Sequence, residues 1–408
     1  MILREVNRVG EGQKNVPKLR FKGYEDAWEQ RKLGEIADIV GGGTPSTAVS
    51  EYWDGDIDWY APAEIVDQIF VNSSQKKITT EGLNNSSAKM LPVGTVLFTS
   101  RAGIGKTAIL TKEGCTNQGF QSIVPHEDEL DSYFIFSRSD ELKRYGETVG
   151  AGSTFVEVSG KQMANMTISI PTTMEEQRQI GTYFRNLDNL ITLHQRKYDA
   201  LKTMKKTLLS KMFPKDGEDI PEIRFKEFTD AWEQRKVSEI TKFHKQGYYT
   251  TEEYNDNKKY YLLRGTDLTG NKLVLKDTPK IDASEKDYDA FKTEIGDFLI
   301  VRSGNVGTYG IVDIDIPAIF GSYLIDFRFD TEKVTNEFFG YFYQSERFQS
   351  QLNKITQSSA NININAENIK STYISLPVLI EQKKISNIMS TLDNCITLHQ
   401  RRSSRIIK

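Results

Sequence analysis

The sequence predicts an α+β protein in which two duplicated domains, each a twisted β-sheet with helices, are joined by two long helices that form an antiparallel coiled coil. Three observations predict this fold class: a long internal repeat, β-rich runs bounded by turn residues within each copy, and a seven-residue periodicity at the end of each copy. The 408 residues also exceed what a single hydrophobic core usually serves. We therefore expect two domains with connecting helices.

The internal repeat consists of two blocks at nearly the same offset. Residues 16–37, VPKLRFKGYEDAWEQRKLGEIA, recur at 220–241 as IPEIRFKEFTDAWEQRKVSEIT, with 13 of 22 positions identical and an offset of 204. The block EQRQIGTYFRNLDNLITLHQRK from Glu176 recurs from Glu381 as EQKKISNIMSTLDNCITLHQRR, at an offset of 205. The whole unit was therefore duplicated. Because the stretches between the blocks have diverged, the two domains are expected to share a framework and to recognise different things.

Turn residues bound the β-rich runs inside each copy, as expected for a domain built around a sheet. In the first copy TVLFTS precedes the turn RAGIG, and in the second DFLIVRS precedes GNVG. With the repeat, these runs predict a first domain at 1–171, a central spacer helix at 172–214, a second domain at 215–377 and a C-terminal spacer helix at 378–408.

Apolar residues at alternating spacings of four and three follow each domain, which is the pattern of a coiled-coil seam. The seam positions are Ile180, Phe184, Leu187, Ile191, Tyr198 and Leu201 in the first helix, and Ile385, Met389, Leu392 and Ile396 in the second. We expect the two seams to pair with each other and to provide docking surface for partners. The alternative left open is that each helix is amphipathic and packs on its own domain.

The two predicted helices differ in length. The first runs from Glu175 to about Met212 and would span roughly 55 Å at 1.5 Å per residue. The second stops at Lys408, before any counterpart of Leu208 or Met212. Its last turns are therefore expected to be missing or to be supplied elsewhere.

Composition narrows the class of protein. The two cysteines, Cys115 and Cys395, lie far apart without metal-ligand spacing, which favours a reducing compartment, and we expect a cytoplasmic protein. The sequence shows no secretory leader and no apolar run long enough for a membrane span, so no membrane association is expected. The formal net charge of −3 gives no global attraction to nucleic acid. Any DNA contact must come from local basic patches.

Several local motifs accompany the domain–helix–domain–helix layout: GGGTPST at 41–47, EYWDGDIDWYAPAEI at 51–65, SRAGIGK at 100–106, TNQGF at 116–120, and EEQRQI opening the first helix. Together they resemble the DNA specificity subunits of type I restriction-modification enzymes, over nearly the whole chain. The second copy departs from this pattern at 243–268, where it has FHKQGYYTTEEYNDNKKYYLLRGTDL.

The resemblance implies a non-catalytic subunit with two target-recognition domains. Each domain would bind one half of a gapped, bipartite site in double-stranded DNA, and the departure at 243–268 implies that the two half-sites differ. The helices would scaffold two methyltransferase subunits and two restriction, or translocase, subunits. S-adenosylmethionine, ATP and Mg²⁺ would belong to those partners, and we expect no cofactor on this chain.

Three sequence patterns resemble ligand-binding motifs but lack a residue that the motif requires. SRAGIGKT at 100–107 has serine where a phosphate loop needs its first glycine. The aspartates at 54, 56 and 58 imitate a calcium loop, but Trp59 and Ile65 stand where glycine and glutamate are required. His194 and His399 have no further histidine or cysteine at ligand spacing, so packing and a local hydrogen bond are the preferred interpretation, and no metal site is predicted.

No methyltransferase, helicase or hydrolase motif occurs, which fits a subunit that gives specificity to enzymes on other chains. Two other functions stay open at this point. One is a DNA methyltransferase that contains its own chemistry. The other is a coiled-coil scaffold that does not bind DNA.

Candidate DNA-binding residues follow β-rich runs and precede turns, where a loop could enter a groove. Arginine suits guanine edges, asparagine and glutamine suit adenine, and hydroxyls suit phosphates. The candidates are Thr44, Ser46, Ser100, Arg101, Lys106, Asn117 and Gln118 in the first domain, and Arg264, Arg302, Ser303 and Asn305 in the second. For each, a solvated surface role is the alternative. Trp28 and Trp232 are expected to anchor their domains rather than to stack on bases.

Overall fold

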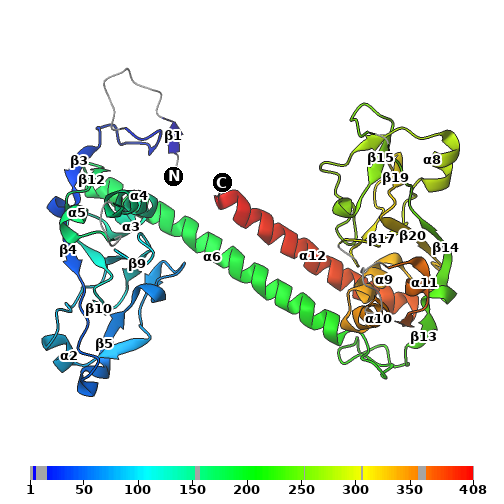
Figure 1. Cartoon of the computed structure of the whole chain (residues 1–408), viewed down its shortest axis with the longest axis horizontal. Coiled ribbons are helices and arrows are strands. Elements are labelled where there is room, and N and C mark those ends of the chain that lie inside the picture. Colours follow the sequence, from blue (N-terminus) through cyan, green and yellow to red (C-terminus); the bar gives the residue numbers. More distant parts are fainter. Residues whose placement is uncertain are drawn as a thin grey trace. The chain divides into compact units, whose positions relative to one another are not determined.

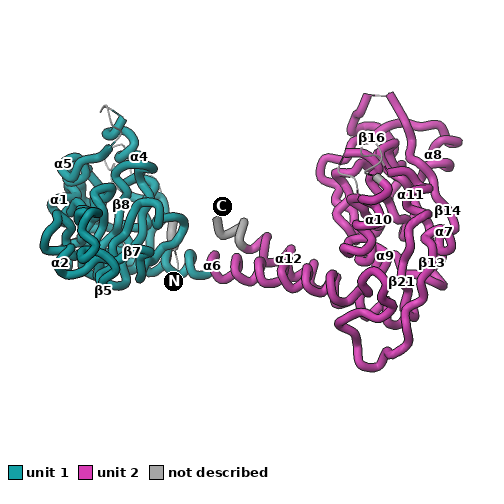
Figure 2. The backbone as a smooth tube through the Cα atoms, turned by 60° about the horizontal axis from the view of Figure 1, so that its bottom comes forward, with its two compact units in different colours: residues 1–190 teal, residues 191–408 magenta. Residues whose placement is uncertain are grey.

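The computed structural model of the chain describes residues 3–5, 16–151, 157–251, 253–304, 307–356 and 364–407. The chain divides into two compact units, residues 1–190 and 191–408, which Figure 2 distinguishes by colour. The boundary falls within the long helix α6 (Met174–Lys211), which begins in unit 1 and ends in unit 2. Each unit combines small β-sheets with helices, so the predicted α+β class is confirmed.

Unit 1 has three main groups of paired strands (Figure 1). The largest is a five-stranded sheet in the order β4-β11-β8-β9-β6, accompanied by a three-stranded sheet in the order β10-β5-β7 and the pair β12-β3. The strands are β1 (Leu3–Glu5), β2 (Leu19–Phe21), β3 (Glu29–Lys32), β4 (Ala37–Gly41), β5 (Trp53–Tyr60), β6 (Phe70–Val71), β7 (Lys76–Ile78), β8 (Val96–Phe98), β9 (Thr107–Leu110), β10 (Cys115–Thr116), β11 (Gln121–Pro125) and β12 (Thr167–Ile170). The helices before α6 are α1 (Leu33–Ile36), η1 (Ser50–Tyr52), η2 (Pro62–Glu64), α2 (Thr80–Asn84), α3 (Ser132–Phe136), α4 (Ser139–Gly150) and α5 (Gly160–Ala164).

Unit 2 repeats this topology. A four-stranded sheet has the order β14-β20-β17-β18, a three-stranded sheet has the order β16-β15-β19, and β13 pairs with β21. The strands are β13 (Glu233–Lys236), β14 (Thr241–Gln246), β15 (Tyr260–Leu263), β16 (Lys280–Ile281), β17 (Phe298–Val301), β18 (Tyr309–Ile311), β19 (Ala318–Phe320), β20 (Leu324–Phe329) and β21 (Tyr373–Leu376). The helices are α7 (Val237–Ile240), η3 (Gly265–Asp267), α8 (Glu285–Phe291), α9 (Asn336–Tyr343), α10 (Glu346–Thr356), α11 (Ala366–Lys370) and α12 (Leu379–Ile407).

The duplication is visible in the strand pairing as well as in the sequence. The parallel pair β5–β10 of unit 1 recurs as β15–β19 in unit 2, and the antiparallel hairpin β8–β9 recurs as β17–β18. Parallel pairing needs a long crossover connection, so its recurrence shows that the diverged middles keep one fold. Sequence divergence between the repeated blocks therefore changed side chains and loops while the framework stayed the same.

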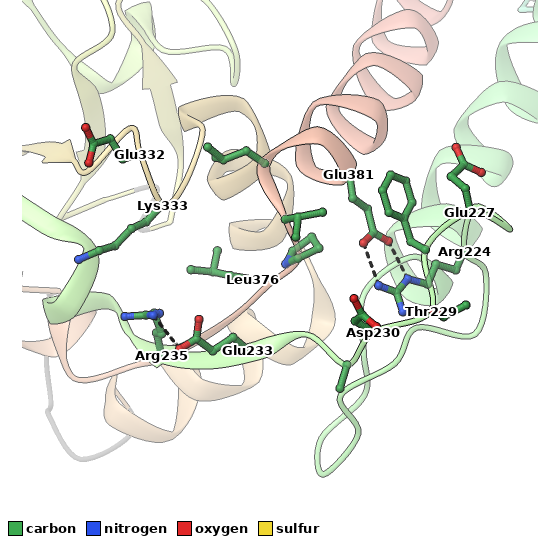
Figure 3. A pocket seen from close by; sticks show the side chains of 15 residues that line it. Arg224, Glu227, Thr229, Asp230, Glu233, Arg235, Glu332, Lys333, Leu376 and Glu381 are labelled. Atoms are coloured by element: carbon green, nitrogen blue, oxygen red, sulfur yellow. Dashed lines mark hydrogen bonds and ion pairs between the residues drawn. The ribbon is translucent and has the colours of Figure 1, made fainter.

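A buried ion pair ties each repeat to its long helix. In unit 1, Arg20 donates from Nε and Nη2 to the two carboxylate oxygens of Glu176, both at 2.8 Å. In unit 2, Arg224 makes the same paired contact to Glu381 at 2.8 and 2.9 Å, as Figure 3 shows. Both glutamates are 1% exposed and lie near the start of their helices. The residues identical in the two repeats thus include the contact that fixes where each helix leaves its domain.

The first turns of both long helices pack on their own domains. Ile180 packs against the core of unit 1, and Ile385 and Met389 belong to the core of unit 2. Of the remaining predicted seam residues, Phe184 is 42% exposed, Leu392 is buried, and Leu187, Ile191, Tyr198, Leu201 and Ile396 are half-buried. The alternative that each helix packs on its own domain therefore holds for the first turns. There the ion pairs of Glu176 and Glu381 already fix the helix.

Beyond those turns, the unit 2 part of α6 runs antiparallel to α12. His194 Nδ1 lies 3.0 Å from His399 Nδ1, and Lys205 Nζ lies 2.7 Å from Asp393 Oδ1. The contact positions rise from 194 to 205 along α6 while they fall from 399 to 393 along α12, so the two helices run antiparallel here (Figure 1). His194 and His399 are repeat equivalents, so a residue here contacts its own counterpart.

Breaking one ion pair should strongly destabilise its unit. We expect Arg224→Met to lower the free energy of unfolding of unit 2 by about 3–5 kcal/mol, because Glu381 would keep a buried charge without its partner. The double variant Arg224→Met/Glu381→Leu should recover most of that loss. Urea denaturation followed by circular dichroism measures both. Equal stability of the single and the double variant would contradict this view of the pair.

Unit 2 has a pair of buried carboxylates, Asp297 and Asp326, at neighbouring strands of its four-stranded sheet. Asp326 is fully buried and Asp297 is 2% exposed, with Arg328 Nε at 2.9 Å from Asp297 and 3.6 Å from Asp326. Burial, and then the charge of Asp297, raise the pKa of Asp326 to about 8. From the strand register, the counterpart of Asp326 in unit 1 is Ser122, which carries no charge.

This carboxyl should make the stability of unit 2 depend on pH. Between about pH 4 and pH 8 the unfolded carboxyl is ionised while the folded one keeps its proton, so stability should fall as pH rises, by up to about 1.4 kcal/mol per pH unit. Asp326→Ser, which copies the serine of unit 1, should flatten this dependence. Urea denaturation at pH 5, 6.5 and 8 tests it, and equal slopes for both proteins would refute the assignment.

Candidate nucleic-acid interface

Four loops of unit 1 converge at one edge, which we call the unit 1 loop edge: residues 42–46, 61–64, 99–106 and 116–120. The Gly43 N–H donates to the Thr116 carbonyl at 2.9 Å, and the Ser100 N–H donates to the Gly119 carbonyl at 2.8 Å. A Cβ added at Gly119 would lie 2.7 Å from Pro62, so the loop 61–64 closes on the same point. Thr44 and Gln118, which are 74 positions apart in the sequence, are thus brought together.

The loop 99–106 is a clamped hairpin turn between β8 and β9. Ile104 is 8% exposed, and a Cβ added at Gly105 would lie 2.8 Å from the Lys143 backbone, so the loop packs closely on α4. Thr107 enters strand β9 and no helix begins there. A phosphate loop needs a helix whose N-terminus faces the phosphates. The structure therefore supports the rejection of a nucleotide site at SRAGIGKT.

The loop 99–106 carries two cationic side chains, Arg101 and Lys106. Arg101 is half-buried and Lys106 is exposed. Within the described residues, neither side chain makes an ion pair or a hydrogen bond to the protein. A cation that the fold does not use is available to an anionic partner such as a phosphate, or to a base edge.

The polar side chains near Arg101 and Lys106 make some hydrogen bonds within the protein. The Thr44 hydroxyl donates to the Gln118 amide oxygen, and the Asn117 amide oxygen accepts the Gly119 N–H at 2.7 Å. Each amide oxygen thus already accepts one hydrogen bond within the protein. Bidentate pairing with adenine would therefore require each of these amide oxygens to accept a second hydrogen bond. Ser46 is exposed beside them, and its carbonyl accepts the Trp53 indole N–H.

Ser100 corrects the predicted set. Its side chain is fully buried, and its backbone carbonyl accepts the Val158 N–H at 2.9 Å. This burial argues against the predicted DNA contact of the Ser100 hydroxyl. A serine before a turn looks the same in sequence whether its hydroxyl points inward or outward.

Unit 2 has an equivalent edge, the unit 2 loop edge, formed by residues 246–249, 264–267, 301–304 and 320–323. The Tyr248 N–H donates to the Phe320 carbonyl at 2.8 Å, and the Arg302 N–H donates to the Tyr323 carbonyl at 2.9 Å. A Cβ added at Gly265 would lie 3.0 Å from Val301, so the third loop joins the same edge. These loops follow β14, β15, β17 and β19, the counterparts of the strands that carry the unit 1 loop edge.

The predicted DNA-binding residues of unit 2 differ in the contacts that they make within the protein. The Arg264 guanidinium donates to the Asp277 carbonyl at 2.7 Å and lies 3.5 Å from Asp267, so it braces its own loop, and its predicted DNA contact stays a prediction. Arg302 and Ser303 are half-buried on the hairpin turn that corresponds to Arg101. Asn305 lies outside the described residues.

Two exposed tyrosines complete the unit 2 loop edge. Tyr249 is 75% exposed and Tyr323 is 67% exposed. They are not among the residues predicted from the sequence, although each lies in a polar run, GYYTTEEY or FGSY, where an aromatic side chain stands out. Unit 1 has Thr44 and Gln118 at its edge, so the two edges differ in chemistry.

The other predicted features are structural. Asp58 is fully buried; burial opposes its ionisation, but hydrogen bonds from Lys112, the Ser74 N–H and Lys77 lower its pKa to about 2. Trp232 is 3% exposed and Trp28 is half-buried, in keeping with anchoring roles. In the described parts of the chain no group of three or more acidic, histidine or cysteine side chains could hold a metal ion. None of the described helices is long and apolar enough to cross a membrane.

Comparison with known proteins gives consistent matches. The family model described as "Type I restriction modification DNA specificity domain" matches residues 25–203 and 229–408. The type I restriction enzyme MjaIX specificity subunit of Methanocaldococcus jannaschii is 31% identical over 225 residues, which are 53% of this chain and 52% of that protein. This chain therefore spans about half the length of that relative.

Two further matches extend over nearly the whole chain. The MjaVIII specificity subunit of the same organism is 23% identical over 394 residues, covering 93% of this chain and 89% of the relative. Among solved structures, the type I restriction-modification S subunit from M. genitalium has a TM-score of 0.53 at 14% identity and covers 95% of this chain and 94% of that one. This second likeness shows a shared fold.

Proposed function

This chain belongs to the type I restriction modification DNA specificity family, and we propose on that basis that it reads a bipartite sequence in double-stranded DNA for catalytic subunits on other chains. One observation carries the proposal: the same loop edge is built twice on one framework but with different side chains. Each unit then contacts one half-site. A repeated scaffold with diverged loops is what the recognition of two different sequences requires.

The proposed DNA contacts are of two kinds: contacts to phosphates, which position the protein, and contacts to base edges, which select the sequence. Arg101 and Lys106 at the unit 1 loop edge, with the Asn117 and Gln118 amide donors and the Thr44 and Ser46 hydroxyls, face phosphates and base edges. In unit 2, Arg302 and Ser303 take the corresponding place, and Tyr249 and Tyr323 add apolar contact. The formal net charge of −3 means that these local cations, and not the whole chain, supply the attraction.

The chemistry belongs to partners. We propose that the helices α6 and α12 dock two methyltransferase subunits and two restriction subunits, which bring S-adenosylmethionine, ATP and Mg²⁺. Exposed apolar residues on the helices, among them Leu190, Leu193, Met204 and Leu398 at 45–52% exposure, provide the contact surface. The assembly would act in the cytoplasm, where the cysteines remain reduced.

Exchange of one domain tests the assignment of half-sites. Replacing residues 38–170 by the equivalent segment of another family member should change one half of the methylated sequence and leave the other half intact, because the framework blocks stay in place. Methylation mapping of genomic DNA from cells that express the chain with its partners measures this. If both halves changed, the assignment of one half-site to each unit would be wrong.

The variant Arg101→Ala tests whether Arg101 contacts a base edge or a phosphate. If Arg101 contacts a base, the variant should relax selection at one position by about 1–3 kcal/mol, and if it contacts a phosphate, it should weaken all sequences alike and reduce the salt dependence by about one charge. Binding assays with duplex libraries at several salt concentrations measure both. Lys22→Ala, an exposed cation of the repeated framework block, is the control and should change neither.

The same assays test the alternative of a scaffold that does not bind DNA. A complex of the unaltered chain that selected no sequence, and whose affinity was the same for Arg101→Ala and the parent, would favour the scaffold and end the proposal. Methyl transfer by the purified chain alone would instead favour a methyltransferase with its own chemistry.

A further inference from the structure

Two histidines at equivalent positions of the repeats face each other between the long helices of unit 2. His194 of α6 and His399 of α12 occur in the same run, ITLHQR, of the second repeated block. Their Nδ1 atoms lie 3.0 Å apart, and their ring centroids lie 5.2 Å apart. Both side chains are half-buried, and on α6 the apolar seam residues Ile191 and Tyr198 flank the contact. The helices therefore meet here through one polar contact.

The distance between the two Nδ1 atoms leaves room for a single proton. A neutral imidazole carries one N–H, so a hydrogen bond forms when one Nδ1 donates and the other accepts. If one ring takes up a further proton, its Nδ1 still donates to the neutral ring and the contact persists. If both rings are protonated, both Nδ1 atoms carry hydrogens, so the hydrogen bond is lost and the two positive rings repel each other. The paired form thus holds one proton fewer than two separate histidines.

Charges on both helices oppose full protonation of the pair. The titratable side chains within five residues of either histidine are Arg196, Lys197, Tyr198 and Asp199 on α6, and Cys395, Arg401 and Arg402 on α12. Four of them are cations, and the one carboxylate, Asp199, already accepts from the Gln195 amide at 3.1 Å. Burial, the neighbouring histidine and the cations Lys197 and Arg402 lower the pKa of His399, in that order. The surroundings of the pair therefore resist a second positive charge.

We infer that the His194–His399 contact is a pH-sensitive switch of the antiparallel helix pair α6–α12. The pair is closed while one proton lies between the two rings, and it opens when both rings are protonated. A second polar contact between the helices, Lys205 with Asp393 at 2.7 Å, contains no histidine, so the opening is expected to stop there. The inference concerns the helix pair alone and does not depend on DNA recognition.

The direction of the pH dependence follows from the proton count. An ordinary histidine takes up a proton below about pH 6.5. The open form then binds two protons and the closed form at most one, so a lower pH favours the open form. One proton of difference raises the ratio of open to closed molecules by up to about tenfold per pH unit. Asp326 acts in the opposite direction, because its protonated form makes unit 2 more stable as the pH falls, so the two effects can be separated.

Distance measurements between two spin labels on the full chain test the switch. The labels are attached at Thr192→Cys and Thr397→Cys, exposed repeat equivalents two residues before each histidine, in a Cys395→Ser background. Cys115 is fully buried and stays unlabelled. We expect a single distance between the labels at pH 7.5 and a growing population at longer distance as the pH is lowered to 5. Circular dichroism at each pH checks that the domains remain folded.

Replacement of the histidines separates the switch from other titrating groups. The double variant His194→Asn/His399→Asn carries amides that do not titrate, so its label distance should be the same at pH 7.5 and pH 5. His244→Asn removes another half-buried histidine of unit 2, which stacks on Phe327, and should keep the pH response of the parent. A parent distance that stays constant down to pH 5 would overturn the inference. A double variant that responds to pH like the parent would also overturn it.

Discussion

The buried arginine–glutamate pair in each repeat is the contact on which the arrangement of the chain depends. A buried carboxylate needs its charge balanced and its oxygens bonded, and one arginine does both through a planar, two-bond contact. Arg20 and Glu176 come from opposite ends of the first copy, as Arg224 and Glu381 do in the second. The pair therefore closes each domain and sets the position from which its long helix departs.

This closure separates the framework from the recognition loops. The strand pairs β3–β12 and β13–β21 each join a strand of the first repeated block to the strand that directly precedes the long helix. The loop edges are formed from the diverged middles, at the ends of strands whose pairing is kept. Side chains at the loop edges can change from threonine and glutamine to tyrosine without disturbing the ion pair, because among the described residues no hydrogen bond or salt bridge joins the two sets.

The long helices have two functions in succession along their length. Their first turns belong to the domain cores, through Ile180 in one unit and Ile385 and Met389 in the other. Further along, the part of α6 in unit 2 pairs with α12 through His194 and His399, and Phe213, which follows α6, packs against Trp232 in the core of unit 2. Within the described residues, Trp28 of unit 1 is half-buried where the equivalent Trp232 of unit 2 is 3% exposed, so the two copies differ in what covers this tryptophan.

The sequence by itself determined the duplication, the α+β class, the two long helices and the family, because repeated blocks and periodic apolar positions are properties of residue order. It also placed Arg101 and Lys106 at a loop. Only the tertiary structure decided which residues of that set are accessible: Ser100 is buried and Arg264 braces its own loop, while Tyr249 and Tyr323 are exposed. The physical reason is that burial and hydrogen bonding depend on contacts between segments far apart in the chain, which no local pattern records.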